Sequence, residues 1–229
     1  MPKSVKDFEV SEKRILVRCD FNVPVDEKGN ILDDLRIKAA LPTIQYLLES
    51  KAKVILMSHL DPQNEGFVEP RFSLEKIAQH LSDILGQDVE KTDNCIGPET
   101  RVKAENLKGG AVLLLENLRF HKGEASNTPQ FAERLAELGD IYINDAFSVC
   151  HREHASIVSV PKILPHGAGL LLQKEIDSLS RIMNNPEHPM IALIGGMKVK
   201  TKVKFVENIS ALADLVIVSG PVKKEIMEK

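Results

Sequence analysis

The sequence predicts an α/β fold in which a parallel sheet carries helices on both of its faces. Two observations favour this fold class. Apolar runs without the alternation of a half-exposed strand recur along the chain, and the stretches between them show the three- and four-residue spacing of helices. Strand and helix therefore alternate, as they do in parallel sheets. The apolar runs cover residues 15–17, 54–57, 112–115 and 141–143.

Three helices are expected between these strands. The first covers about residues 35–48 and contains Pro42, which favours either a kink or a later start. The other two cover residues 73–86 and 128–139, each from a Ser or Thr at the N-cap to a Gly at the end. Their apolar stripes are typical of helices that pack on a core, so no function is assigned to them.

The composition is that of a globular protein of one or two domains. The chain has 229 residues, of which 43% are hydrophobic, and a formal net charge of −3. It has no apolar stretch of about twenty residues and no apolar signal region, so we expect a cytoplasmic protein without a membrane partner. The acidic balance argues against nucleic acid as a partner. Three cysteines without a CxxC pair indicate reduced thiols and no zinc framework.

Polar side chains follow each apolar run at the end where the strand should finish. After the first run, Arg18, Asp20 and Asn22 occupy alternate positions, so they should point to the same side of the strand. The carboxyl ends of parallel strands form the ligand-binding edge of open α/β sheets. These residues therefore indicate a binding site, with an edge strand that has a charged outer face as the alternative.

The residues at the expected strand ends are mainly basic, although the chain as a whole is mildly acidic. Several arginines in one crevice would match the oxygens of a phosphorylated acid, because each guanidinium offers a fixed fork of donors. Arginines scattered over the surface are the alternative interpretation. The basic residues are Arg18, Arg36, His59, Arg119, His151, Arg152 and His154.

Two further segments contain residue types found in binding sites. Residues 150–154, Cys-His-Arg-Glu-His, match neither a zinc finger nor the HExxH helix in spacing, so no metal site is predicted. Residues 195–201, Gly-Gly-Met-Lys-Val-Lys-Thr, resemble a P-loop that lacks the glycine before its Lys-Thr pair. A glycine turn that leads into a lysine-rich helix start is still suited to phosphate oxygens.

Six motifs stand in order along the chain: RILVRCDFNVP at 14–24, DDLRIKAALPTI at 33–44, MSHL at 57–60, ENLRF at 116–120, NDAF at 144–147 and His151-Arg152. In order and spacing they resemble the phosphoglycerate kinase family, over essentially the whole chain. The resemblance implies a Rossmann-like first domain in a two-domain glycolytic transferase. Such an enzyme moves a phosphoryl group between 1,3-bisphosphoglycerate and ADP, giving 3-phosphoglycerate and ATP, with Mg²⁺ on the nucleotide.

Carried over position by position, the resemblance implies a substrate site in the first domain and a nucleotide site that lies mostly outside this chain. Arg36 and Lys198 are implied as catalytic residues, with Arg36 facing the transferring phosphoryl group. Lys198 and Lys202 are implied as nucleotide-binding residues, for ATP or ADP with Mg²⁺. No general base is expected, because the acceptor carboxylate is already ionised. The implied substrate-binding residues are Asp20, Phe21, Asn22, Arg36, His59, Arg119 and Arg152.

Four segments depart from the family pattern. Asp61-Pro62-Gln63 stands where Gly-Arg-Pro is usual, which removes an arginine and adds a carboxylate beside the anion site. We expect this change to weaken substrate binding. The other departures are Ser148-Val149-Cys150 for Gly-Thr-Ala, Lys200-Thr201 for Ser-Asp or Ala-Asp, and Ser219-Gly220-Pro221 for a Gly-Gly-Gly turn.

The expected organisation is a phosphoglycerate-binding domain at residues 1–170, a connector helix at 171–188 and the beginning of a nucleotide-binding domain at 189–229. The chain has about half the usual family length, so the second α/β domain is expected to be incomplete, with exposed apolar strand faces and a poorly ordered or partner-dependent segment. We therefore expect the chain alone to be inactive, and a separate C-terminal half or self-association to cover those faces. The alternatives are a non-catalytic phosphorylated-acid binding protein and an inactive truncated paralogue.

Overall fold

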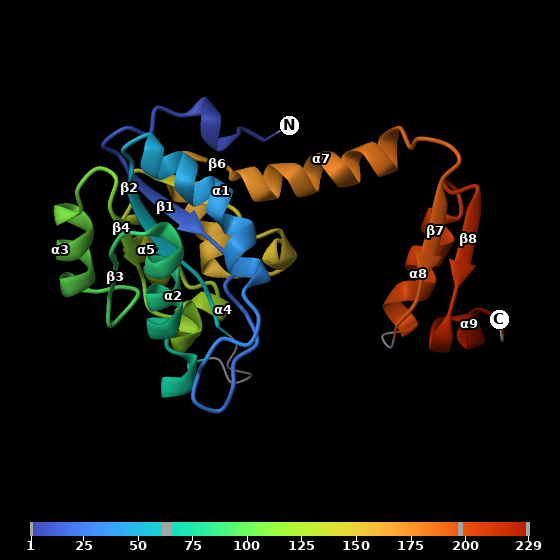
Figure 1. Ribbon diagram of the computed structural model, residues 1–229, viewed down its shortest axis with the longest axis horizontal. Helices are drawn as coiled ribbons and strands as arrows, with labels where there is room; N and C mark the ends of the chain where they lie inside the picture. Colours follow the sequence, from blue (N-terminus) through green and yellow to red (C-terminus); the bar gives the residue numbers. More distant parts are fainter. Residues whose placement is uncertain (1, 61–65, 197–198, 228–229) are drawn as a thin grey trace. The chain divides into compact units, whose positions relative to one another are not determined.

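The computed structural model describes residues 2–60, 66–196 and 199–227, and its contacts divide the chain into two units. The first unit ends at Lys174 and the second begins at Glu175. Helix α7, Leu170–Asn184, begins in the first unit and ends in the second (Figure 1). Among the residues described, no helix has the length and apolar character needed to cross a membrane.

A six-stranded parallel sheet forms the centre of the first unit. Its order is β3-β4-β2-β1-β5-β6, and β1 pairs with β2 on one side and with β5 on the other. The predicted fold class is therefore confirmed, and the alternative that the first apolar run is an edge strand is wrong. The strands are β1 (Arg14–Arg18), β2 (Lys53–Met57), β3 (Val89–Lys91), β4 (Val112–Leu114), β5 (Ile141–Asn144) and β6 (His166–Ala168).

The register of the central strands brings their carboxyl ends to one edge. Arg18, the last residue of β1, is opposite Met57 of β2 and Asn144 of β5. The segments that leave these three strands therefore begin side by side. This edge is where the sequence predicts the binding site.

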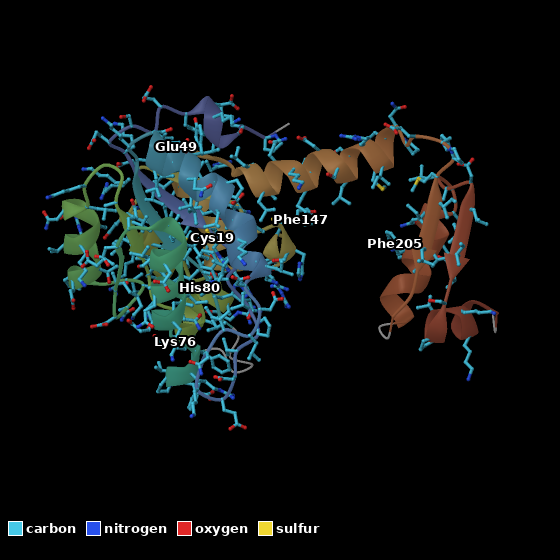
Figure 2. All side chains as sticks on the ribbon, viewed as in Figure 1. Cys19, Glu49, Lys76, His80, Phe147 and Phe205 are labelled. Atoms are coloured by element: carbon cyan, nitrogen blue, oxygen red, sulfur yellow. The ribbon has the colours of Figure 1, made fainter. Side chains whose placement is uncertain are left out.

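Helices cover both faces of this sheet (Figure 1), and Figure 2 shows the side chains on the same ribbon. On one face, α1 and α2 pack on alternate residues of β1 and β2, including Ile15 and Val17. On the other face, α3, α5 and α6 pack on the intervening residues, including Leu16 and Tyr142. The helices are α1 (Leu35–Glu49), α2 (Glu75–Leu85), α3 (Pro98–Asn106), α4 (Lys122–Ala125), α5 (Pro129–Ala136) and α6 (Val160–Ile163).

Short helical turns connect several of these elements. Single 3-10 turns precede β1, precede α2, and follow β4 and β5, whereas a π-helical turn precedes α6. Two of them, η3 and η4, stand directly after strands at the carboxyl edge of the sheet. The turns are η1 (Val5–Asp7), η2 (Pro70–Phe72), η3 (Leu118–Phe120), η4 (Phe147–Val149) and η5 (Ala155–Ser159).

Helix α1 begins at Leu35 and runs through Pro42, so the prediction of a later start is wrong. Pro42 is exposed, and so is Lys38, whose carbonyl loses its helical partner at the proline. On this exposed side of the helix, water can replace the missing partner. Helix α2 ends at Leu85 and is capped as predicted by Gly86, in a left-handed conformation with φ 66°, whereas its N-cap is Leu74 and not the predicted Ser73.

The second unit contains two parallel strands and two helices. Strand β7 (Ile191–Ile194) pairs with β8 (Leu215–Val218), while α8 (Val199–Ile209) and α9 (Gly220–Met227) contribute to a small core with Ile194. Alternate strand residues remain exposed, most of all Leu193 at 75%. The apolar strand face expected from the sequence is therefore present, and its poor order or dependence on a partner stays a prediction.

Candidate functional site at the carboxyl edge of the first sheet

Asp20 and Arg36 come together two residues beyond β1. Arg36 lies in the first turn of α1, and its Nη1 is 2.8 Å from Asp20 Oδ2, with the arginine side chain 51% exposed and the aspartate side chain 10% exposed. The Ser148 hydroxyl, from η4 after β5, donates to the same carboxylate oxygen. Asp20 thus fixes the guanidinium of Arg36 at the edge of the sheet while leaving part of it open to solvent.

His59 follows β2 and is 3% exposed. Burial is the main reason why the pKa of His59 lies well below its ordinary value, and the positive charges of Arg18, Arg119, His154 and Arg36 lower it further. The imidazole is therefore neutral near pH 7. Four of the predicted basic residues are therefore close enough to His59 to act on its ring: Arg18, Arg36, Arg119 and His154.

Arg119 is held on η3, directly after β4. The fully buried Asn117 accepts the Arg119 N–H at 3.0 Å and the Leu60 N–H at 3.3 Å through its side-chain oxygen. Its amide nitrogen donates to the Leu60 carbonyl at 2.6 Å. Asn117 therefore ties the segment after β2 to the segment after β4, and it fixes His59 and Arg119 on neighbouring loops.

The remaining predicted substrate residues of the first unit differ in placement. Asn22 lies beside Asp20, and its N–H donates to Asp20 Oδ1 at 3.0 Å. Phe21 is fully buried in the core between the sheet and α1, which leaves no ligand contact for its side chain, and its N–H donates to Ser58 Oγ. Arg152 is exposed in the turn after η4, and no contact with Asp20, Arg36 or His59 is found among the described residues.

Two positions of interest, Lys198 of the second unit and Asp61 of the first, lie outside the described residues, so the expected effects of both remain predictions. Lys202 lies in the first turns of α8, where only the course of the backbone is described. Within the described ranges, no group of three His, Cys, Asp or Glu side chains could hold a metal ion.

Comparison with known proteins settles the family. The family model described as phosphoglycerate kinase matches residues 5–228. The chain belongs to the phosphoglycerate kinase family. A phosphoglycerate kinase of Moorella thermoacetica is 49% identical over 217 residues, and one of Aquifex aeolicus is 46% identical over 220 residues; each match covers 95% of this chain and 55% of the relative.

Solved phosphoglycerate kinases have the same fold. The Coxiella burnetii structure matches with a TM-score of 0.85 and 37% identity over all of this chain and 57% of its own. The Pyrococcus horikoshii structure gives a TM-score of 0.86 and 37% identity over 96% of this chain and 56% of its own. The chain thus spans about half the length of the relatives and solved family members it matches.

Three buried residues near this edge of the sheet, Glu124, Ser156 and Asp145, were not predicted as functional, whereas Arg18 was among the predicted basic residues. Arg18 and Glu124 are 1% and 0% exposed, and the buried Ser156 hydroxyl lies between them. Asp145, also fully buried, accepts the N–H groups of Leu171 and Leu172 at the start of α7. A charged residue shortly after an apolar run was the available signal for Asp145, whereas the sequence around Glu124 and Ser156 carries none.

Proposed function

We propose that the first unit binds the three-carbon phosphorylated acid of the phosphoglycerate kinase reaction, 3-phosphoglycerate or 1,3-bisphosphoglycerate. The supporting observation is the set of basic residues at the carboxyl edge of the sheet: Arg36, His59 and Arg119 come from three separate segments, together with the buried Arg18. Each guanidinium can donate two parallel hydrogen bonds to a phosphate or carboxylate group. A small acid that carries both groups can therefore accept hydrogen bonds from several arginines.

Asp20 supports this role through its control of Arg36. Its carboxylate holds Arg36 Nη1 at 2.8 Å and leaves the rest of the guanidinium available. In the proposed reaction, Arg36 faces the phosphoryl group and stabilises the charge that spreads over its oxygens in the transition state. Asn22 and Arg152 are proposed to contact the same acid, and Phe21 contributes the packed support under Asp20 and Asn22.

The proposed nucleotide residues belong to the second unit. Gly196 follows β7 with φ 113°, and Gly220, with φ 64°, is the first residue of α9 after β8, so a glycine in the left-handed region lies between each strand and the following helix. Backbone N–H groups at such turns fit the phosphates of ATP or ADP, and Lys198 and Lys202 would add positive charge there. When bound, Mg²⁺ with the nucleotide neutralises charge on the phosphates.

Calorimetric titration of the whole chain with 3-phosphoglycerate tests the proposal. We expect saturable binding, at least about tenfold weakened in Arg36→Ala because a charge-assisted contact is lost. Arg134→Ala is the matched control: Arg134 is an exposed arginine in the last turn of α5, a helix that packs on the face of the sheet. Glycerol 3-phosphate, which lacks the carboxylate, should bind more weakly than 3-phosphoglycerate.

The outcomes separate the alternatives. Equal affinity for both ligands would indicate a general phosphate site and contradict the assignment of an acid. No saturable heat from a folded sample would contradict the proposed function and favour an inactive member of the family.

A further inference from the structure

The buried guanidinium of Arg18 makes three contacts that fix it completely. Its Nε donates to Ser156 Oγ at 3.0 Å, its Nη1 donates to the carbonyl of Cys19, and its Nη2 lies 3.2 Å from Nδ1 of His59. Only 1% of Arg18 is exposed, so it cannot turn outward to meet a ligand in this structure. Arg18 can therefore act on a ligand only through the side chain of His59.

The contact with His59 has a defined direction. A guanidinium has five donors and no acceptor, and it stays protonated in proteins. Nδ1 of His59 must therefore accept the hydrogen bond, which leaves the ring proton on Nε2. Within the described part of the chain, no group accepts a hydrogen bond from His59 Nε2–H, so this donor is available to a ligand oxygen.

Ser156 and Glu124 orient Arg18 from behind. Glu124 is fully buried on α4, and its Oε1 is 2.5 Å from Ser156 Oγ while its Oε2 accepts the Ser156 N–H at 3.0 Å. The carboxylate can only accept, so the serine hydroxyl points its hydrogen at Glu124 and its lone pairs at Arg18. A buried positive charge and a buried negative charge are thus joined through one hydroxyl group, which lowers the cost of burying both.

We propose that Arg18 is a positioning residue that holds His59 as a neutral donor through Nε2–H, with Ser156 and Glu124 fixing the guanidinium. The donation of this N–H to an oxygen of the phosphorylated acid rests on the proposed function; the tautomer does not. His59 then gives the ligand a directed hydrogen bond, whereas Arg36 and Arg119 supply the opposite charge. Protonation of Nδ1 would break the contact with Arg18, so the ring stays neutral in the complex as well.

The tautomer is measured directly by long-range ¹H–¹⁵N correlation spectra of the histidine rings in the whole chain. The chain has seven histidines, and the signals lost in His59→Gln identify His59. We expect a neutral ring with the proton on Nε2, unchanged between about pH 6 and pH 8. A proton on Nδ1, or a charged ring at neutral pH, would overturn the proposal without any variant of Arg18.

Variants then test the cause. In Ser156→Ala we expect a mixture of the two His59 tautomers, because Arg18 loses its acceptor. Ser159→Ala is the matched control, since Ser159 lies in the same turn and its hydroxyl bonds Asn127 at 2.6 Å instead. Arg18→Met should give the same mixture. An unchanged Nε2–H tautomer in a folded Arg18→Met sample would contradict the role of Arg18.

Two substitutions of His59 separate positioning from ligand binding. The Gln side chain places its NH₂ near the position of Nε2, whereas Asn reaches only the position of Nδ1 and can still accept from Arg18. We expect His59→Gln to keep the 3-phosphoglycerate affinity within about threefold and His59→Asn to lose about tenfold. The reverse order would contradict the proposal. An Nε2–H tautomer in a protein that binds no 3-phosphoglycerate would leave the positioning intact and contradict only the proposed function.

Discussion

Asp145 lies at the end of β5 and holds the first turn of α7, so its titration should change the stability of the first unit. Its Oδ1 accepts the Leu171 N–H at 2.9 Å and the Leu172 N–H at 3.1 Å. Burial raises the pKa of Asp145 from 3.8 to about 6, and these N–H groups and Thr43 only partly oppose the shift. We predict that Asp145→Asn, which keeps the acceptor and removes the titration, changes the dependence of stability on pH.

The sign follows from proton linkage. Because the pKa of Asp145 is higher in the folded state, the folded chain binds the proton more tightly, and stability falls as pH rises from 3.8 through about 6. The full shift corresponds to about 3 kcal/mol, of which about 2 kcal/mol falls between about pH 4.5 and pH 7.5. As the pH rises from about 4.5 to about 7.5, the free energy of unfolding of the wild type, minus that of Asp145→Asn, should therefore decrease by about 2 kcal/mol.

Urea unfolding followed by tyrosine fluorescence measures this difference in the right part of the molecule. The chain has no tryptophan and two tyrosines, Tyr46 and Tyr142, and both lie in the first unit. Other titrating groups are common to the two proteins, so they cancel in the difference. A difference that is constant within about 0.5 kcal/mol over this pH range would refute the reasoning about Asp145.

Three further predictions use the same unfolding assay or sedimentation. Gly139→Ala should cost about 1–3 kcal/mol, because the new Cβ would lie 2.8 Å from Leu16 Cβ in the central strand; a loss no larger than that of an exposed Ala substitution would contradict this. Leu81→Ala in α2, where Leu81 is fully buried, should cost about 2–5 kcal/mol, and a neutral result would mean that α2 does not pack as described. Leu193→Lys on the exposed face of β7 should reduce any self-association seen in sedimentation and leave the helical circular dichroism signal unchanged, whereas a loss of helical signal would show that this face is covered.

The central strands could be predicted because their residues are buried on both sides. Runs such as 54–57 contain only apolar residues, a pattern typical of a strand that is buried between two helical layers. The edge strands β3 and β6 were missed because they have three residues each and carry polar side chains such as Glu90 and His166. The sequence therefore predicts the middle of the sheet better than its borders.

The site could be predicted in part for the same reason. Arg36 and His59 directly follow structural signals, a helix start and a strand end, and the topology then brings them to one edge. Glu124 lies on the short helix α4 and Ser156 in the turn η5, and the sequence around them carries no local signal of a site. Ser156 contacts Arg18, which is 138 positions away in the sequence, so only the fold shows its importance. The burial of Phe21 follows from its place on the inward side of the segment after β1.

We propose above that the phosphorylated acid binds at the carboxyl edge of the first sheet. Amide hydrogen exchange with and without 3-phosphoglycerate tests this binding site most directly. A bound ligand protects the amides that it stabilises. We predict that the ligand slows exchange in residues 18–22, 58–60 and 117–119 and leaves exchange in β7 and β8 unchanged. This slowing should be lost in Arg36→Ala and kept in Arg134→Ala. Protection confined to any other part of the chain, or equal protection in both variants, would contradict the account.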